Sequence, residues 1–139
     1  MISVSNSTGI WTADDGTVLV PQGQCWTGND SNPDVNPTGL KGKLNPFYQD
    51  THCVGPIPVD TVWQTGVWGD YNRVGLNACP LTLVSGNAFG RTGFFIHGPD
   101  KRPAYYGQES EGCLVVTHNF RINMLMPLLP TGTQFKVVA

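Results

Sequence analysis

The sequence predicts one domain of the mainly β class, and three observations lead to this. The chain has 139 residues, enough for a real core, since a domain of this size hides roughly two-thirds of its unfolded surface. It contains 17 Gly and 11 Pro. Short runs rich in β-branched and aromatic residues lie between these turn formers, a pattern typical of short strands joined by turns. We therefore expect a single domain over residues 1–139.

Strands are expected from one end of the chain to the other. Asp15-Gly16 separates two short apolar runs. Because Gly tolerates the positive φ of a tight turn, this dipeptide predicts a hairpin, and the chain should begin as a meander. The predicted strands are Ile2–Ser5, Ile10–Ala13, Thr17–Pro21, Gly23–Thr27, Val59–Gly66, Cys79–Val84, Gly93–His97, Gly112–Val116 and Thr133–Val138.

Residues 27–53 interrupt this strand pattern. They are rich in Asn, Asp, Pro and Gly and show no apolar period, which predicts a long surface loop. Long loops inside compact domains are more often functional than idle.

A helix is expected only near the C-terminus. Phe120, Met124 and Leu128 recur at a spacing of four, which predicts one short helix. Its cap is expected at Thr117 or Asn119 and its end near Pro127 or Pro130.

Charge and composition exclude several classes of function. The formal net charge is -2, and Lys and Arg are scattered without a run, so we expect no nucleic-acid partner. No apolar stretch approaches the ~20 residues of a membrane span, and the first residues lack the basic start and apolar core of a Sec signal peptide. The four cysteines show no C-x-x-C spacing, so we expect neither a metal site nor a cofactor.

The stretch HGPDKRPAYYGQESEGC begins with His97 and ends with Cys113. A Gly before a nucleophile lets the backbone turn, so the amides of Gly112 and Cys113 can face one oxygen as an oxyanion hole. Ser110 is expected to fix this turn with a hydrogen bond rather than to attack.

The two ends of this stretch are expected to meet if the strands that carry them are neighbours. His97 would then deprotonate the thiol of Cys113 and lower its pKa toward neutrality, which makes a nucleophile for an amide carbonyl. The plainer alternative is a small core cysteine beside a histidine satisfied by a backbone carbonyl.

These residues resemble the signature of the L,D-transpeptidase (YkuD-type) family, an HG pair followed by S-H-G-C and apolar residues. "FFIHG" and "SEGCLVV" match it, with His97, Gly98, Ser110, Gly112 and Cys113 in order. "NPFYQDTHCVGPIPVDTVWQTG" and "LMPLLPTGTQFKVV" look like its Gly-Pro-Ile-Pro turn with central strand and its closing helix, turn and strand. The resemblance covers most of the chain from residue 27 onward and implies an L,D-transpeptidase-like β-sandwich or barrel of mixed strands with one short C-terminal helix.

The resemblance also implies a reaction. Cys113 would be the nucleophile and His97 its general base, with the carbonyl of Gly98 or a nearby backbone group orienting the ring. The substrate would be a peptidoglycan stem tetrapeptide, attacked at the carbonyl of its third residue, a diamino acid, with loss of the terminal D-alanine. Water, a free D-amino acid or a neighbouring stem amine would then take the thioester. These acceptors give L,D-carboxypeptidase, exchange or cross-linking activity, and the sequence leaves all three open.

Two residues are expected to contact this substrate. The guanidinium fork of Arg91 matches the terminal carboxylate of a stem, with a solvated Arg91 as the alternative. Glu111 stands where the commoner family motif has His, and it bears on substrate contact and on the wall of the oxyanion hole. Tyr105 and Tyr106 in the covering loop would pack against sugar or peptide, or anchor the loop.

The combination of "GNAFGRTGFFIHG" with S-E-G-C most resembles a small branch of the family found among type VI secretion effectors, which attack the peptidoglycan of rival bacteria. It implies a secreted antibacterial protein that acts in the periplasm of a target bacterium, with a secretion-system carrier and a cognate immunity protein as partners. In an oxidising space Cys25 and Cys53, which flank the long loop, are expected to join. A non-catalytic cell-wall binding module and a housekeeping or phage-coded enzyme of the same chemistry remain as alternatives.

Overall fold

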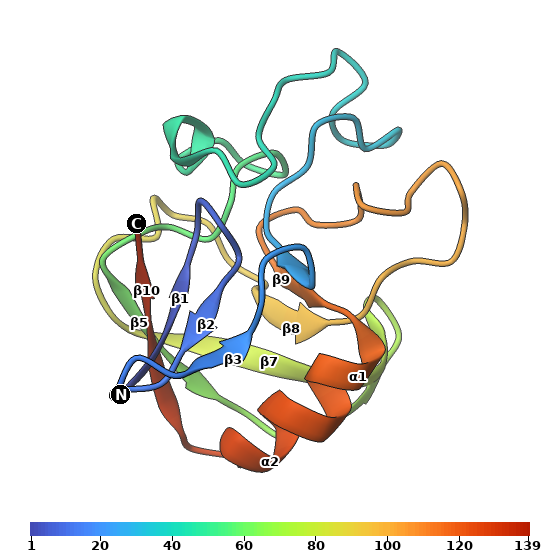
Figure 1. Cartoon of the computed structure of the whole chain (residues 1–139). Coiled ribbons are helices and arrows are strands. Elements are labelled where there is room, and N and C mark those ends of the chain that lie inside the picture. Colours follow the sequence, from blue (N-terminus) through green and yellow to red (C-terminus); the bar gives the residue numbers. More distant parts are fainter.

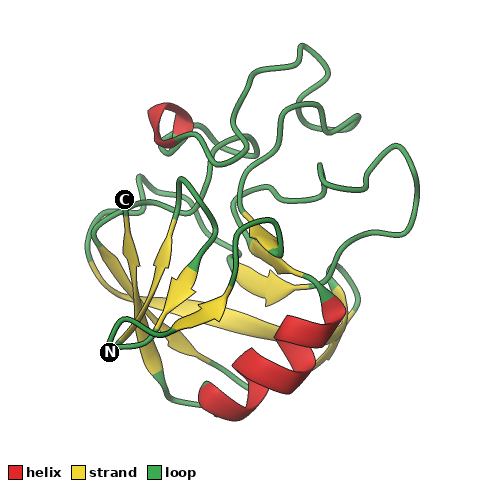
Figure 2. Ribbon diagram, viewed as in Figure 1, coloured by secondary structure: helices red, strands yellow, loops and turns green.

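The computed structural model describes all 139 residues and confirms a mainly β fold of mixed strands with one short helix near the C-terminus (Figures 1 and 2). Ten strands form one sheet in the order β3-β2-β1-β10-β5-β7-β8-β9-β4, and β6 pairs with β7. The pairs β1 with β10 and β8 with β9 are parallel, and the other pairs are antiparallel. The strands are β1 (Ile2–Ser5), β2 (Trp11–Thr12), β3 (Val18–Val20), β4 (Cys25–Trp26), β5 (Thr61–Thr65), β6 (Gly69–Tyr71), β7 (Gly75–Ser85), β8 (Phe95–His97), β9 (Leu114–Val116) and β10 (Gln134–Val138).

The predicted meander is present in β1 to β3. Gly16 turns the chain between β2 and β3 with φ at 89°, the conformation for which a Gly was expected. The meander ends there, because β4 pairs with β9 instead of β3. This pairing places β4 at the opposite end of the sheet from β3. Both residues of β4 are buried there.

The long strand β7 joins the two halves of the sheet. It pairs with β6 at its start, with β8 in its middle and with β5 toward its end. It is longer than the predicted Cys79–Val84, and β6 was not predicted, since residues 69–78 lack a β-branched run. Gly75, with φ at 92°, and a hydrogen bond from the Asn77 amide to Asp70 close this hairpin instead.

Both halves of the sheet contribute side chains to one core of 16 buried residues. The ring centroids of Trp11 and Phe135 lie 5.0 Å apart, and those of Trp63 and Phe94 lie 4.8 Å apart. Fully burying such a side chain contributes about 2 kcal/mol or more. The strands beside the cavity described below are therefore anchored from beneath by a packed core.

The predicted helix is confirmed, but its buried side differs from the apolar spacing. It comprises α1 (His118–Phe120), a π-helical stretch η2 (Arg121–Leu125) and α2 (Met126–Leu128). Thr117 is the N-cap residue, and the helix ends before Pro130 with Pro127 inside it. The buried positions are Arg121, Leu125 and Leu129, one residue beyond the predicted stripe of Phe120, Met124 and Leu128.

Residues 27–53 form a loop, as predicted, with a single 3-10 turn η1 (Pro46–Tyr48). Several of its asparagines are buried and not only exposed on a surface: Asn29, Asn32 and Asn36 are at most 5% exposed. The Asn29 side chain donates to the carbonyls of Cys53 and Ser110 at 2.8 and 2.7 Å. This loop and residues 98–110 extend from the same end of the sheet (Figure 1).

None of the helical segments is long and apolar enough to cross a lipid bilayer.

Candidate functional site

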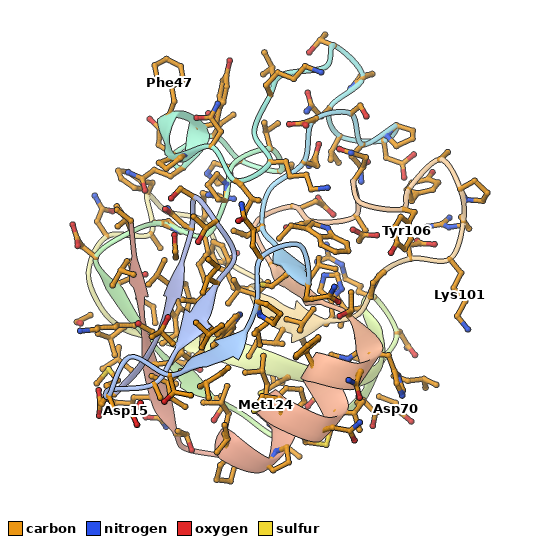
Figure 3. All side chains as sticks on the ribbon, viewed as in Figure 1. Asp15, Phe47, Asp70, Lys101, Tyr106 and Met124 are labelled. Atoms are coloured by element: carbon orange, nitrogen blue, oxygen red, sulfur yellow. The ribbon has the colours of Figure 1, made fainter.

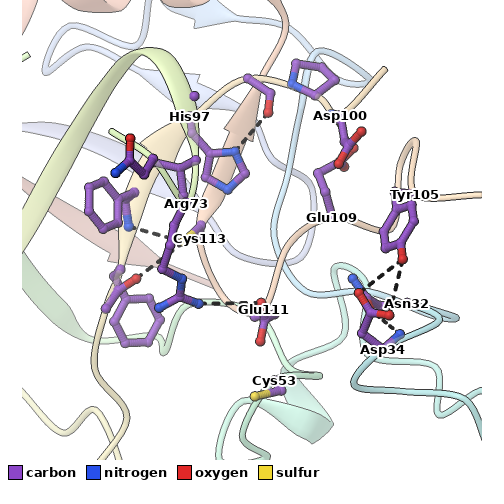
Figure 4. Close-up of a pocket in the computed structure, with 18 of the residues that line it drawn as sticks. Asn32, Asp34, Cys53, Arg73, His97, Asp100, Tyr105, Glu109, Glu111 and Cys113 are labelled. Carbon is purple, nitrogen blue, oxygen red and sulfur yellow. Dashed lines mark hydrogen bonds and ion pairs between the residues drawn. The ribbon is translucent and has the colours of Figure 1, made fainter. Parts of the chain in front are cut away.

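A cavity of about 670 Å³ opens at that end of the sheet (Figure 4). Residues 91–95, His97, Gly98 and Cys113 lie at its base, the tip of the β6–β7 hairpin forms one rim, and the two long loops form the opposite wall. This volume suits a ligand of several residues. The cavity contains both His97 and Cys113.

His97 and Cys113 face the same side of the sheet. In the parallel pair of β8 with β9, His97 lies opposite Val115 and Ile96 opposite Leu114, so Cys113 comes level with Phe95. Since side chains alternate along a strand, residues 95, 97 and 113 share one face. The predicted pairing of the two strands is thus confirmed, and Figure 4 shows both side chains on one wall of the cavity.

The imidazole of His97 is held in one tautomer. Its Nδ1 lies 2.8 Å from the carbonyl oxygen of Gly98, and because a carbonyl only accepts, Nδ1 carries the proton and Nε2 keeps its lone pair. The expected orientation of the ring by Gly98 is present. Burial of His97, which is 5% exposed, and the nearby Arg121 guanidinium lower its pKa to about 4.

A buried arginine, Arg121, lies next to the residue that follows this histidine. Its guanidinium donates to the carbonyls of Val116 and Asn77 and packs against Gly98, where an added Cβ would lie 2.3 Å from Nη1. A larger residue would displace this buried guanidinium, so Gly98 lies directly against a buried cation. Sequence reasoning missed Arg121, because a charged residue on a helix is usually exposed.

The thiol of Cys113 is neutral in this structure. It is 8% exposed, its Sγ accepts from the Phe95 amide at 3.3 Å, and it lies 3.6 Å from the Gly93 carbonyl as a donor. Burial raises its pKa to about 11. The expectation of a pKa lowered by His97 is wrong for the free protein, because no hydrogen bond joins the two side chains and desolvation dominates.

Ser110 fixes the turn before Cys113, as predicted. Its buried hydroxyl donates to the Cys113 carbonyl at 2.6 Å and accepts from the amides of Gly112 and Gly28. The Gly112 amide is therefore used within the turn and is not free for an oxyanion, which corrects that half of the prediction. The Cys113 amide donates to no protein group, so it remains the candidate donor.

Gly112 itself is required by space as well as by conformation. Its φ is 123°, and an added Cβ would lie 2.4 Å from Arg91 Nη2 and 2.8 Å from Phe94. The turn that presents Cys113 is packed directly on Arg91.

Arg91 does not have the predicted role of a substrate clamp. It is 5% exposed, and its two terminal nitrogens donate to the carbonyls of Gln49, Gly55, Pro56 and Glu111. All four terminal N–H groups are thus used inside the protein. The guanidinium ties the end of the long loop to the turn before Cys113, and the alternative of a solvated arginine is equally wrong.

Glu111 and Arg73 meet at the mouth of the cavity. Arg73 Nη2 lies 3.8 Å from Glu111 Oε2, with side chains 80% and 36% exposed. Arg73 comes from the tip of the β6–β7 hairpin and was not predicted as a site residue. The turn residues Asn72 and Gly75 were the available signal for a hairpin there.

The loop wall is held by side chains at its inner edge. Glu109 accepts from Trp26 Nε1 at 2.6 Å and from the amides of Asp100 and Gly107. Tyr105 donates to Asp34, and the ring of Tyr106 packs 6.1 Å from that of Trp26. Tyr105 therefore anchors residues 98–110 to the other loop of the wall, and Tyr106 anchors them to β4.

The four cysteines are free thiols, so the expected disulfide between Cys25 and Cys53 is not formed. Cys25 is buried in the core, where Trp11 donates to its sulfur, whereas Cys53 lines the cavity. No group of three or more His, Cys, Asp or Glu side chains is placed to hold a metal ion.

No family model, no curated protein and no solved structure matches the chain. The chemistry is therefore argued from the site itself: a neutral thiol, a neutral imidazole with Nε2 free, and one unused amide at the base of a polar cavity.

Proposed function

We propose that the protein is a cysteine acyl-transfer enzyme that acts on peptidoglycan stem tetrapeptides. One observation carries the reaction type: Cys113 and His97 face one cavity from the same side of two paired strands, with the lone pair of His97 Nε2 available for a proton. The resemblance of the HG and S-E-G-C segments to the L,D-transpeptidase signature supplies the substrate class and supports an L,D-transpeptidase-like fold.

The acylation step needs no cofactor. His97 Nε2 takes the proton of the Cys113 thiol as the sulfur attacks the carbonyl carbon of the third stem residue. The tetrahedral oxyanion accepts from the free Cys113 amide. The bond to the terminal D-alanine then breaks, the imidazolium returns its proton to the leaving amine, and a thioester remains on Cys113.

The thioester is resolved by an acceptor whose proton His97 removes. Water gives a free carboxylate on the third residue, and a D-amino acid or a stem amine gives a new amide; each restores the thiol. At pH 7 both groups are neutral, because the pKa is about 11 for Cys113 and about 4 for His97. These charge states favour the general-base route. A stable thiolate-imidazolium pair is not needed.

Mass spectrometry of muropeptides after incubation tests the reaction. We expect wild-type protein to convert tetrapeptides to tripeptides, or to exchange the terminal residue when a D-amino acid is added. Cys113→Ala should abolish both, and Cys53→Ala, which removes the other thiol of the cavity, should keep them. Unchanged muropeptides with folded wild-type protein would instead favour the cell-wall binding module.

The biological role is proposed from the same resemblance: an antibacterial effector carried by a secretion system into the periplasm of a target bacterium and countered there by an immunity protein. Directed to the periplasm by an added signal sequence, the protein should cause swelling or lysis, and in the cytoplasm it should be harmless. Equal toxicity in both compartments, or harmless periplasmic protein with trimmed muropeptides, would favour a housekeeping or phage enzyme.

A further inference from the structure

We propose that Arg73 and Glu111 together form a subsite for an α-amino-acid zwitterion, a free ammonium and a free carboxylate on one carbon, at the mouth of the Cys113 cavity. This inference rests on the proposed function, since it assigns a part of the substrate to that same cavity. It replaces Arg91 as the expected carboxylate ligand and gives Glu111 a defined partner.

Elimination points to these two residues. The other carboxylates and guanidinium groups that line the cavity are engaged: Glu109 accepts three hydrogen bonds, Asp100 and Arg102 pair with each other, and Arg91 is used by four carbonyls. Asp34 accepts from Tyr105. The Arg73 guanidinium forms no hydrogen bond, and the Glu111 carboxylate is approached only by the thiol of Cys53, a weak donor, so nearly all of their donor and acceptor capacity is available to a ligand.

Their mutual contact is too loose to satisfy either group. A formed charge-assisted hydrogen bond between nitrogen and oxygen is about 2.7 to 2.9 Å long, whereas Nη2 and Oε2 are 3.8 Å apart. Exposed pairs of this kind contribute little, because water screens the charges. A ligand that brings an anion to Arg73 and a cation to Glu111 exchanges this weak contact for two closer ones.

The pair lies beside the reacting sulfur. Glu111 is two residues before Cys113, and its charge raises the pKa of that thiol, while Arg73 and Arg91 lower it. Because Arg73 and Glu111 lie this near the thiol, they are in reach of the side chain of a substrate residue whose carbonyl carbon is at Sγ. Figure 4 shows Arg73 and Glu111 facing each other beside Cys113.

The backbone positions of both residues are fixed by their neighbours. Arg73 is at the hairpin turn closed by the pairing of Tyr71 with Gly75, and the Tyr71 ring packs edge-on against Phe95, 5.4 Å between centroids. The Glu111 carbonyl accepts from Arg91. The backbone of both residues is thereby tied to the strands under the cavity, so a ligand has to order only the two side chains.

Opposite charges so near each other suit a ligand with opposite charges on one carbon. Two substrates of the proposed reaction have this chemistry: the far end of a meso-diaminopimelate in the stem, and a free D-amino acid that acts as acceptor. A lysine at the same stem position supplies the ammonium without the carboxylate.

The test compares substrates that differ only in this group, with wild type, Arg73→Gln and Glu111→Gln, and with Arg102→Gln as the matched control because its guanidinium is already paired. Hydrolysis is measured on tetrapeptides with meso-diaminopimelate or L-lysine at the third position. Exchange is measured on the lysine tetrapeptide with deuterium-labelled D-alanine, so that the incoming residue differs in mass from the one that leaves, or with ethylamine as acceptor. Mass spectrometry gives kcat/KM for each.

We expect Arg73→Gln to lose about tenfold or more in kcat/KM wherever the carboxylate is present, and to be unchanged where it is absent, since a hydrogen bond to a charged group contributes about 1.5 to 3 kcal/mol. Loss with the diaminopimelate donor assigns the subsite to the donor, and loss with D-alanine assigns it to the acceptor. Glu111→Gln should weaken every substrate with an ammonium at the subsite.

Equal kcat/KM of wild type and Arg73→Gln on all four reactions overturns the subsite and leaves the proposed function intact. An equal loss on all four also overturns it, because Arg73 would then act only on the thiol. If wild type converts no peptide at all, the proposed function fails instead.

Discussion

The base and the loop wall of the cavity are built by different means. The base, strands β8 and β9 with the turn at Ser110, is fixed by strand pairing, by buried side chains and by two buried arginines. The wall, residues 27–53 and 98–110, contains one short 3-10 turn and is held by side chains that bond to backbone groups, such as Asn29, Glu109 and Gln108. Figure 3 shows Tyr106 and Lys101 on the second of these loops.

This difference separates positioning from recognition. Arg91 and Arg121 are buried and bond only to carbonyls, so they stabilise the geometry of Cys113 and His97 without facing a ligand. Arg73 and Arg102 are exposed at the rim. We infer that the reacting pair is set by the sheet, whereas the choice of substrate depends on rim and loop residues that can change without disturbing the core.

The two thiols of the cavity give the largest expected contrast. Because burial raises the pKa of Cys113 to about 11, its alkylation by iodoacetamide at pH 7 should be slow and should rise about a thousandfold by pH 10 with the thiolate fraction. Peptide mapping should find Cys53, which is more exposed, labelled first at neutral pH. Fast labelling of Cys113 at pH 7 would instead show an ion pair with His97.

Removing the base of the reaction gives the next effect. His97→Gln keeps a hydrogen-bonding side chain but has no nitrogen that can take a proton, so acylation should slow by ~100-fold or more. Single-turnover mass spectrometry of the acyl-enzyme measures this step. The control is His52→Gln, an exposed histidine of the opposite wall; equal rates for both variants would contradict the assignment of the base.

Loss of a buried arginine should cost far more stability than loss of an exposed one. Arg91→Met leaves two buried and two partly buried carbonyls without their donor, and we expect the free energy of unfolding to fall by about 3 kcal/mol or more. Arg102→Met should change it by less than about 1 kcal/mol. Denaturant titration measures both, and similar values would show that Arg91 does not brace the base of the cavity.

Acid should destabilise the base through His97. Its folded pKa is about 4 and its usual value 6.5, so the unfolded chain takes up a proton that the folded protein excludes. The stabilisation is complete above pH 6.5 and is lost as pH falls toward 4, an expected loss of roughly 3 kcal/mol. Denaturant titrations at pH 7 and pH 4 measure it, and His97→Gln should lack this share of the pH dependence.

The smallest expected effect is local to the wall. Glu109→Gln keeps one acceptor oxygen where the carboxylate has two, which should cost about 1 to 2 kcal/mol in the loop. Hydrogen exchange of amides 98–108 should accelerate about tenfold with the core amides unchanged. Glu111→Gln is the control, since its carboxylate accepts no hydrogen bond from residues 98–108. Equal protection in both variants would show that Glu109 does not hold the wall.

Much of the fold follows from local signals. Each predicted strand overlaps an observed one, because period-two patterning and Gly-rich turns act over a few residues. β6 and the start of β7 were missed, because their polar hairpin has no such run and is closed by Gly75 and a single Asp70 contact. The helix was predicted but its buried side was not. The residues that it buries are Leu125, Leu129 and the charged Arg121.

The sequence by itself determined the β class, the positions of nine of the ten strands along the chain, and the placement of a His and a Cys at two strand ends with Gly98 and Gly112 beside them. Only the tertiary structure decided the charge states and the partners. Cys113 and His97 are neutral because they are buried together, Arg91 is a brace because four carbonyls surround it, and Arg73 reaches Glu111 from a hairpin 38 positions earlier in the chain. Burial and long-range pairing arise when distant segments pack, so local residue patterns do not specify them.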